Sequence, residues 1–449
     1  METTALQKIW TKSKLLIKGF VIVLLILLLQ LPAYYVQKLV EERENRQREA
    51  ITEVSNKWAS NQVIAGPMLG LPYVEYINDS PAKKTVKHIA YFLPDELTIN
   101  STVIPKEKYR GIYKVMLYSS NINLSGAFMN IRPDKLKISV ENVLWSEAFV
   151  SINISDVKGL NDELNLKWNN QVFTLSPANP GEGLSALLNR SNADELRNVR
   201  FSANINLSGS EQMLFVPVGK STTVNINSRW PHPSFTGDIL PQNTDIRDDG
   251  FAATWKSLAH KRSFPQQWND NSYGFYKNVG TGQNFSDAAT HDIASSAFGV
   301  NLFVPVNSYQ KTMRSVKYAS LCILLTFVAF FLIETSNKRS IHPFQYGLIG
   351  LALILFYTLL LSVSEYLGFN ISYLIASFCT IGLITWFVKD LLLSTRLSLL
   401  MAIVLVFIYT YMFTILQLQD YSLLLGSIGL FITLGVVMHF SKKISVAQN

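Results

Sequence analysis

The chain has few of the residues that build disulfide, metal and charge-based sites. Only two of its 449 residues are cysteine, Cys322 and Cys379, and both lie inside apolar runs. The long polar stretch before them has none, so it has neither a disulfide framework nor a thiolate metal site and depends on its own core. Charged residues make up 16% of the chain, against about 25% in soluble domains. Together with the apolar runs, this excludes a wholly soluble protein and a disordered chain.

Catalytic and metal-binding motifs are also missing. The six histidines include no pair at the spacing of helical zinc ligands, and no HExxH stretch occurs. There is no G-x-S-x-G nucleophile elbow and no phosphate-binding P-loop. A hydrolytic set of His232, Asp238 and a nearby serine has only spacing in its favour. We therefore predict no catalytic, cofactor-binding or metal-binding residues, no cofactor and no enzyme activity.

The net charge of +8 does not indicate a nucleic-acid partner. Most of the excess Lys and Arg lies beside apolar segments, where such residues set membrane topology. The densest basic run of the polar region, Lys83, Lys84 and Lys87, lacks the interleaved aromatic residues of a phosphate-binding face. The predicted partner is the lipid bilayer.

The first apolar run, residues 15–36, has about the 20 residues that a membrane-spanning helix needs. The apolar core of a cleaved signal peptide is shorter, at about 7–15 residues. The run follows several lysines and ends in Pro32, Ala33, Tyr34 and Tyr35. We predict an uncleaved signal-anchor helix after a cytoplasmic segment, 1–14; a cleaved signal peptide is the alternative.

Five further spans are predicted in a C-terminal bundle that covers residues 316–440. Their approximate limits are 316–334, 344–364, 371–388, 397–416 and 421–440. Basic residues occur in every second connection: the loops at 365–370 and 417–421 have none, whereas the other connections contain Lys338, Arg339, Lys389, Arg396, Lys442 and Lys443. Because positive loops stay inside, both termini, including the tail 441–449, are expected in the cytoplasm and residues 37–315 in the periplasm.

The predicted spans have no charged residue at mid-depth, which argues against an ion-coupled transporter. Glu334, Glu365, Asp390 and His439 lie near the ends of spans, and we expect their polar groups to reach water there. Glycines such as Gly347 and Gly350 are expected to let neighbouring helices pack closely.

The region 37–315 is predicted to be a β-rich domain with a charged N-terminal helix at 38–60. In that helix Ile51, Val54 and Trp58 form one apolar stripe facing the domain. Alternation of apolar and polar residues then predicts strands at 85–92, 135–140, 149–157, 164–175, 199–207 and 221–228. A short helix is expected within 177–200. The fold class is a membrane protein of the α+β type, with a sandwich-like or large curved antiparallel sheet outside the membrane.

Two short repeats occur in this region. Asn-Ile-Asn-Leu-Ser-Gly is found at 121–126 and 204–209, and Leu-Phe-Val-Pro-Val at 214–218 and 302–306. Internal duplication of a β unit is one interpretation; the other is that alternating strands reuse the same few residues.

A proline-rich segment is the candidate recognition or structural motif. It contains Trp230, Pro231, His232, Pro233 and Phe235. The prolines stiffen the backbone, and stiff loops with aromatic groups suit recognition because little entropy is lost on binding. The other interpretation, which we favour, is a structural corner with Trp230 and Phe235 packed inward.

Three segments, 229–235 (RWPHPSF), 341–348 (IHPFQYGL) and 362–369 (SVSEYLGF), resemble those of the CreD family of bacterial inner-membrane proteins. The resemblance covers nearly the whole chain. It implies an inner-membrane location, a link to cell-envelope integrity, and expression under an envelope- or carbon-source-responsive two-component system. It implies no catalytic residues.

The favoured function is therefore non-enzymatic support of envelope integrity or of the envelope stress response. The periplasmic β domain would bind an envelope component or a periplasmic or membrane protein. A transporter or channel, with the domain as a capture or gating module, is the alternative. A membrane-bound hydrolase of envelope polymers is the third hypothesis.

Overall fold

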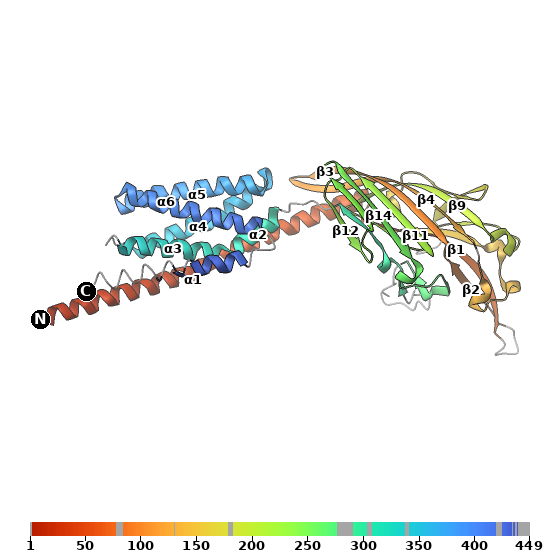
Figure 1. Cartoon of the computed structure of the whole chain (residues 1–449), viewed down its shortest axis with the longest axis horizontal. Coiled ribbons are helices and arrows are strands. Elements are labelled where there is room, and N and C mark those ends of the chain that lie inside the picture. Colours follow the sequence, from red (N-terminus) through yellow and green to blue (C-terminus); the bar gives the residue numbers. More distant parts are fainter. Residues whose placement is uncertain are drawn as a thin grey trace. The chain divides into compact units, whose positions relative to one another are not determined.

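The computed structural model describes residues 2–77, 84–129, 131–177, 183–275, 291–302, 308–336, 341–418, 424–432, 434–435 and 438. The chain divides into two compact units (Figure 1). One unit joins residues 1–48 to residues 306–449, and it is helical in its described parts. The other unit, residues 49–305, contains the β-sheet.

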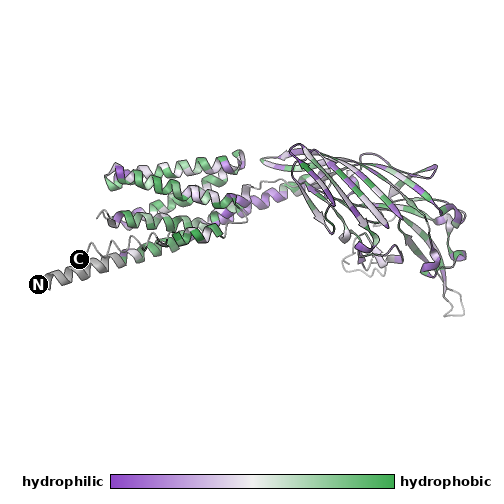
Figure 2. Cartoon of the chain, viewed as in Figure 1, coloured by the Kyte–Doolittle hydropathy of each residue, from purple (hydrophilic) through white to green (hydrophobic). Residues whose placement is uncertain are grey.

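The helical unit contains long apolar helices (Figure 2). Its helices are α1 (Glu2–Trp58), whose last residues belong to the β unit, α2 (Ser308–Lys317), α3 (Ala319–Ser336), α4 (Pro343–Leu367), α5 (Phe369–Leu392) and α6 (Thr395–Gln417). Among the described residues, α1, α4, α5 and α6 are long and apolar enough to cross a membrane; α2 and α3, bent by 46°, add a fifth span if counted together. The predicted N-terminal apolar helix and C-terminal helix cluster are thus confirmed. Much of the predicted span 421–440 lies outside the described residues.

The start of α4 is set by a capping box. His342 Nδ1 accepts a hydrogen bond from the backbone N–H of Phe344, and the side chain of Gln345 accepts one from the His342 N–H. Pro343 stands at the first helical position, where its missing N–H costs nothing. Two residues of the 341–348 segment, His342 and Gln345, therefore satisfy backbone groups that a helix start leaves unpaired.

An ion pair between a half-buried lysine and a buried glutamate joins α1 to the end of α3. Lys18 Nζ contacts the Glu334 carboxylate, and Glu334 is only 4% exposed. The same carboxylate accepts hydrogen bonds from Tyr346 Oη at 2.8 Å and from the Ile341 N–H at 2.9 Å. The expectation that Glu334 reaches water is therefore wrong, because these donors replace water around the charge.

A second charged cluster lies further along α1. Arg43 Nε stands 3.8 Å from Glu365 Oε1, which also accepts a hydrogen bond from Tyr309 Oη at 3.1 Å. Between the two clusters, a side chain at Gly350 would collide with Leu29 of α1. The glycine thus permits the close helix packing expected from the sequence.

The described residues of the β unit form eighteen strands. They are β1 (Gln62–Ile77), β2 (Lys84–Phe92), β3 (Glu96–Arg110), β4 (Tyr113–Phe128), β5 (Phe149–Ile154), β6 (Leu164–Trp168), β7 (Gln171–Pro177), β8 (Leu184–Leu187), β9 (Val199–Ser210), β10 (Gln212–Phe215), β11 (Ser221–Ser228), β12 (Pro233–Gly237), β13 (Asn243–Arg247), β14 (Gly250–Leu258), β15 (Gln267–Asn269), β16 (Tyr273–Gly274), β17 (His291–Asp292) and β18 (Phe298–Leu302).

Most of these strands form one large curved sheet. Its order is β12-β18-β10-β1-β5-β8-β7-β6-β9-β4-β3-β11-β14-β13, with β2 and β15 branching from β1. Most neighbours are antiparallel, but β1 with β10 and β3 with β11 are parallel. The inner faces of distant strands meet: Trp255 of β14 stacks on Phe298 of β18, with ring centroids 5.9 Å apart, and Tyr118 of β4 donates a hydrogen bond to the Gln212 carbonyl of β10. One apolar core fills the interior.

Three of the sequence-based element predictions need correction. Residues 135–140 form no strand; they lie in and between the 3-10 turns Pro133–Leu136 and Val140–Asn142, because Pro133 and the left-handed backbone of Lys137 break an extended run. Residues 164–175 form a hairpin, β6 and β7, that reverses at the left-handed Asn169. The helix expected within 177–200 is a single 3-10 turn, Ala193–Leu196; residues 178–182 lie outside the described part.

The charged helix expected at 38–60 is the continuation of α1, with ion pairs one turn apart such as Glu42–Arg46 and Glu53–Lys57. Of its predicted apolar stripe, Ile51 and Val54 are half-buried, whereas Trp58 is 37% exposed, with Lys106 Nζ 6.0 Å from its ring centroid.

Candidate binding surface

The outward face of the sheet is unusual in its side chains. Along β3, β4, β9 and β11 the inward residues are mostly apolar and buried, as in Leu97, Ile99 and Val103 of β3. In the middle of these strands the outward residues are Thr, Asn and Ser, whereas charged residues such as Glu96, Lys106 and Arg200 face outward nearer the strand ends. A solvated sheet face usually carries Lys, Glu and Arg in numbers, so the lack of charge here needs an explanation.

The strand register aligns these residues in rows across the sheet. The central row crosses β7, β6, β9, β4, β3, β11, β14 and β13, with Asn165 placed beside Asn204 by the adjacent pairing of Leu166 with Ala203. It contains Thr174, Asn165, Asn204, Asn123, Asn100, Asn225, Thr254 and Asn243. The rows on either side contain Ser202, Ser125, Thr98 and Thr223, and Asn206, Asn121, Thr102 and Asn227. We call these three rows the Asn/Thr face.

Hydrogen bonds hold the amides of this face in place. Asn121 donates to Asn204 at 3.0 Å, Asn204 donates to Asn123 at 2.9 Å, and Asn123 donates back to Asn121 at 3.1 Å. Further along, Asn225 donates to Asn100 at 2.8 Å and accepts from the Thr254 hydroxyl at 2.9 Å. An amide has two N–H donors and two acceptor positions, so each of these side chains retains capacity for a ligand.

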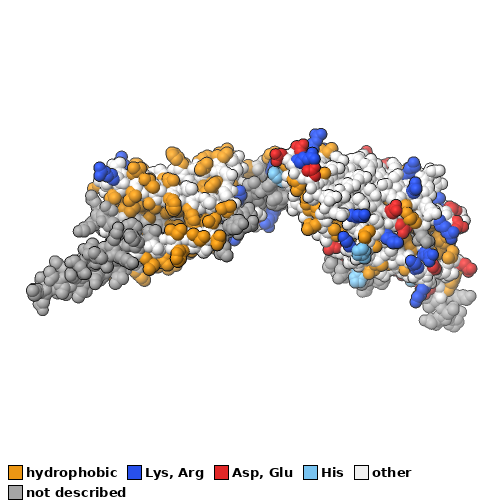
Figure 3. Space-filling model, viewed as in Figure 1, with side chains coloured by type: hydrophobic (Ala, Val, Ile, Leu, Met, Phe, Trp, Pro, Cys, Tyr) orange, Lys and Arg blue, Asp and Glu red, His pale blue; other side chains and the backbone are white. Residues whose placement is uncertain are grey.

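Charged residues stand at the margins of the Asn/Thr face. Lys167 pairs with Ser202 at one end of a row, and Lys256 with Thr223 at the other. Asp245 pairs with Ala252 beyond Asn227. In the space-filling view, the middle of the strands is largely uncharged, and Lys, Arg, Asp and Glu side chains gather at the end of the β unit where β3 is labelled in Figure 1 (Figure 3).

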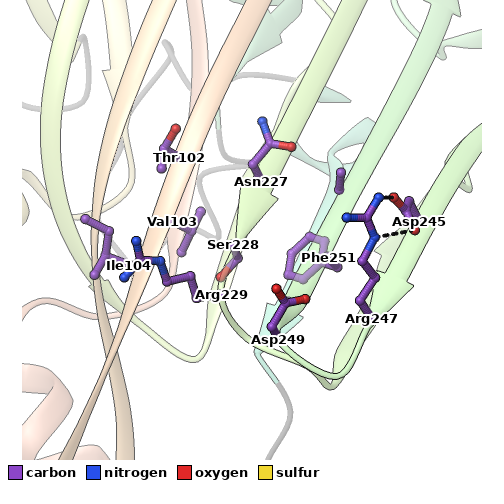
Figure 4. Close-up of a pocket in the computed structure, with 12 residues that line it drawn as sticks. Thr102, Val103, Ile104, Asn227, Ser228, Arg229, Asp245, Arg247, Asp249 and Phe251 are labelled. Atoms are coloured by element: carbon purple, nitrogen blue, oxygen red, sulfur yellow. Dashed lines mark hydrogen bonds and ion pairs between the residues drawn. The ribbon is translucent and has the colours of Figure 1, made fainter.

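A cleft of about 490 Å³ lies at one end of the face, where β3 and β11 leave the rows (Figure 4). Its polar lining includes Thr102 and Asn227 of the Asn/Thr face, together with Arg229 and Asp249. The hydrogen bonds that Arg247 donates to Asp245 raise the pKa of its guanidinium. Among the described residues, Arg229 has no such carboxylate partner within ion-pair distance.

The proline-rich segment follows directly from this cleft. Trp230 is 8% exposed, and its Nε1 donates a hydrogen bond to the His232 carbonyl at 3.0 Å. Pro231 is half-buried and the His232 side chain is exposed. Pro233 begins β12, and Phe235 packs against Phe251 and Trp255 in the core. This geometry suits a corner better than a recognition loop, because both large aromatic residues are used internally.

Other titratable side chains that could take part in chemistry do not form one cluster. His88 lies between Asp270, 2.8 Å from its Nδ1, and Glu75, 3.2 Å from its Nε2, and stacks on Tyr73. Burial, with the two carboxylates, raises the pKa of Tyr73 to about 12. Within the described residues no group of His, Cys, Asp and Glu side chains could hold a metal ion. His232 and Asp238, the weak hydrolytic pair, flank β12 on opposite sides and form no hydrogen bond with each other.

Comparisons with known proteins match nearly the whole length of the chain. The family model described as "Inner membrane protein CreD" matches residues 14–447. The chain belongs to the CreD family. It is also 29% identical to the inner membrane protein CreD of Escherichia coli strain K12 over 430 residues, which cover 93% of this chain and 91% of that protein. This match confirms the family that the sequence resembles and supports an inner-membrane location for the chain.

Sequence reasoning did not identify the Asn/Thr face, although one signal of it was visible. The two Asn-Ile-Asn triplets of the first repeat lie on β4 and β9 and pair with each other, with Ile122 opposite Ile205. The repeat thus marks neighbouring strands that share one face. The second copy of the other repeat, 302–306, lies largely outside the described residues.

Proposed function

We propose that this CreD-family protein supports the integrity of the cell envelope without catalysing a reaction, and that its β unit acts outside the inner membrane by binding an envelope component. The observation that carries the proposal is the Asn/Thr face, an exposed and uncharged array whose amides are fixed by one another. Fixed side chains lose little entropy on binding, so such an array is suited to recognition.

The proposed placement rests on the charges of the helix connections. The α5–α6 connection is flanked by Lys389 and Arg396, whereas the α4–α5 connection, at Gly368, has no basic residue nearby. Positive connections stay in the cytoplasm, which puts both termini inside and residues 49–305 in the periplasm.

The test adds charge to the face. A strain that lacks the protein is complemented with the wild type, with the double variant N123E/N225E, or with N56E, which changes an exposed Asn of α1 away from the face. We expect wild type and N56E to restore survival in detergent and bile salt, and N123E/N225E to fail at equal protein abundance. Full restoration by N123E/N225E would show that the face is not used.

A further inference from the structure

The chemistry of the Asn/Thr face restricts what can bind to it. Protein partners are usually held by buried aromatic and apolar anchors, and the three rows contain only Asn, Thr and Ser. Anionic lipid headgroups, lipopolysaccharide and nucleic acids need clustered cations. The charges that border the rows, such as Lys167, Lys256 and Asp245, are of both signs. A mostly uncharged polymer with many donors and acceptors is the chemical match.

The spacing of the rows adds a second restriction. Adjacent strands lie about 4.8 Å apart, so amide or hydroxyl groups recur across the sheet at about the length of one sugar ring. The central row crosses seven strand gaps and extends over roughly 30 Å. An extended polysaccharide can therefore place successive rings over successive strands. Acetamido groups on such rings offer the same donor and acceptor pair as the Asn side chains beneath them.

The cleft at the end of the face adds a complementary charge. Arg229 presents a guanidinium that has no ion-pair partner among the described residues, and Asp249 lies in the same cleft (Figure 4). The guanidinium can bind an isolated carboxylate, while Asp249 disfavours a polymer that is anionic along its length. This combination fits a neutral glycan that carries short peptides with carboxylate groups.

We propose that the Asn/Thr face binds the glycan strands of the peptidoglycan wall, the acetamido-bearing polymer outside the inner membrane, and that Arg229 binds a carboxylate of its peptide stems. This inference rests on the proposed function, since it requires the β unit to face the periplasm. Because the rows lack aromatic stacking platforms, affinity comes from many hydrogen bonds and rises with the length of the strand.

The experiment uses the full-length protein in detergent micelles and purified sacculi as the probe. We expect wild type and N56E to co-sediment with sacculi, and N123E/N225E to bind at least tenfold more weakly with an unchanged melting temperature. If N123E/N225E has a lower melting temperature than wild type, N123T/N225T takes its place. This variant keeps the face uncharged but removes two amides, and it is expected to bind sacculi several-fold more weakly than wild type. Binding should change less than twofold between 100 and 500 mM salt, because few ions are released.

Further measurements distinguish binding to the glycan from binding to its peptides and from binding to other envelope polymers. Sacculi whose peptide carboxylates have been converted to neutral amides, with a carbodiimide and an uncharged amine, should still bind, with the contribution of Arg229 lost, so that R229Q matches wild type only there. Long chitin oligosaccharides should compete and lipopolysaccharide should not. Failure of wild type to sediment with sacculi, or binding abolished by salt, would overturn the glycan inference. If N123E/N225E still failed to restore envelope survival in that case, the proposed function would stand with a different partner.

Discussion

At the residue scale, the most consequential contact is the Lys18–Glu334 pair, which links positions 316 residues apart. Its two members stand near the ends of separate apolar runs, where an isolated charge is expected to reach water. No sequence pattern connects them, because an ion pair between helices depends on how the helices pack. Trp230 and Phe235 are different: two nearby prolines and large aromatic side chains predicted a corner, and in the structure Trp230 is buried while Phe235 is half-buried against the core.

Removing one member of the buried pair should destabilise the helical unit strongly. K18M leaves the Glu334 carboxylate without its cation, which costs about 3–5 kcal/mol in buried pairs. The double variant K18M/E334Q retains an acceptor for Tyr346 Oη and removes the stranded charge, so it should recover more than half of the loss. The measurement is thermal unfolding of the detergent-solubilised protein.

The matched control is R46M on the same helix, which breaks an exposed pair with Glu42 and should change stability by less than about 0.5 kcal/mol. Additive effects of K18M and E334Q would mean that the two side chains do not interact in the folded protein.

At the scale of elements, alternation predicted most strands but not their partners. The strands at 85–92, 199–207 and 221–228 were found almost as expected, because a period of two follows directly from the pleat. The hairpin at Asn169 and the turns at 133–142 were missed, since left-handed residues and a single proline outweigh local alternation. The Asn/Thr face could not be predicted, because neighbours in its rows, such as β3 and β11 or β4 and β9, lie far apart along the chain.

The junction between α1 and β1 should make stability depend on pH. The Asp156 carboxylate accepts hydrogen bonds from the Ser60 N–H and hydroxyl, both at 2.9 Å, and from the Lys158 N–H. Burial raises the pKa of Asp156, but these hydrogen bonds outweigh it and the pKa is lowered. The stabilisation is therefore complete above the usual aspartate pKa of about 3.9 and is lost as the pH falls through the lowered value.

We expect D156N to be about 1 kcal/mol less stable than wild type at pH 7, since the carboxylate is only partly buried, and the gap to close below pH 4. Denaturant unfolding from pH 3 to pH 7 measures this difference. D134N, at an exposed aspartate in a 3-10 turn, serves as the control and should show no such trend. A D156N deficit that stays constant across this range would contradict the assignment.

At the scale of the whole molecule, the division into an apolar helical unit and a β unit was predictable, because hydropathy and alternation change abruptly along the chain. The bend between α2 and α3 was not, since both helices lie near the single apolar run predicted at 316–334. Family membership over residues 14–447 implies that both units are inherited together. The side of the membrane on which each unit lies still depends on the charge argument alone.

That argument is tested by two single cysteines in a C322A/C379A background. V172C places a thiol on β7, where the native side chain is 66% exposed, and T395C places one at the start of α6 beside Arg396. With basic connections held in the cytoplasm, a membrane-impermeant maleimide should label V172C in intact spheroplasts and leave T395C unlabelled. After permeabilisation both should react, which confirms that each thiol is accessible. Labelling of T395C alone in intact spheroplasts would show that the topology is the reverse of the predicted one. The β unit would then lie in the cytoplasm, and the wall glycan could not be its partner.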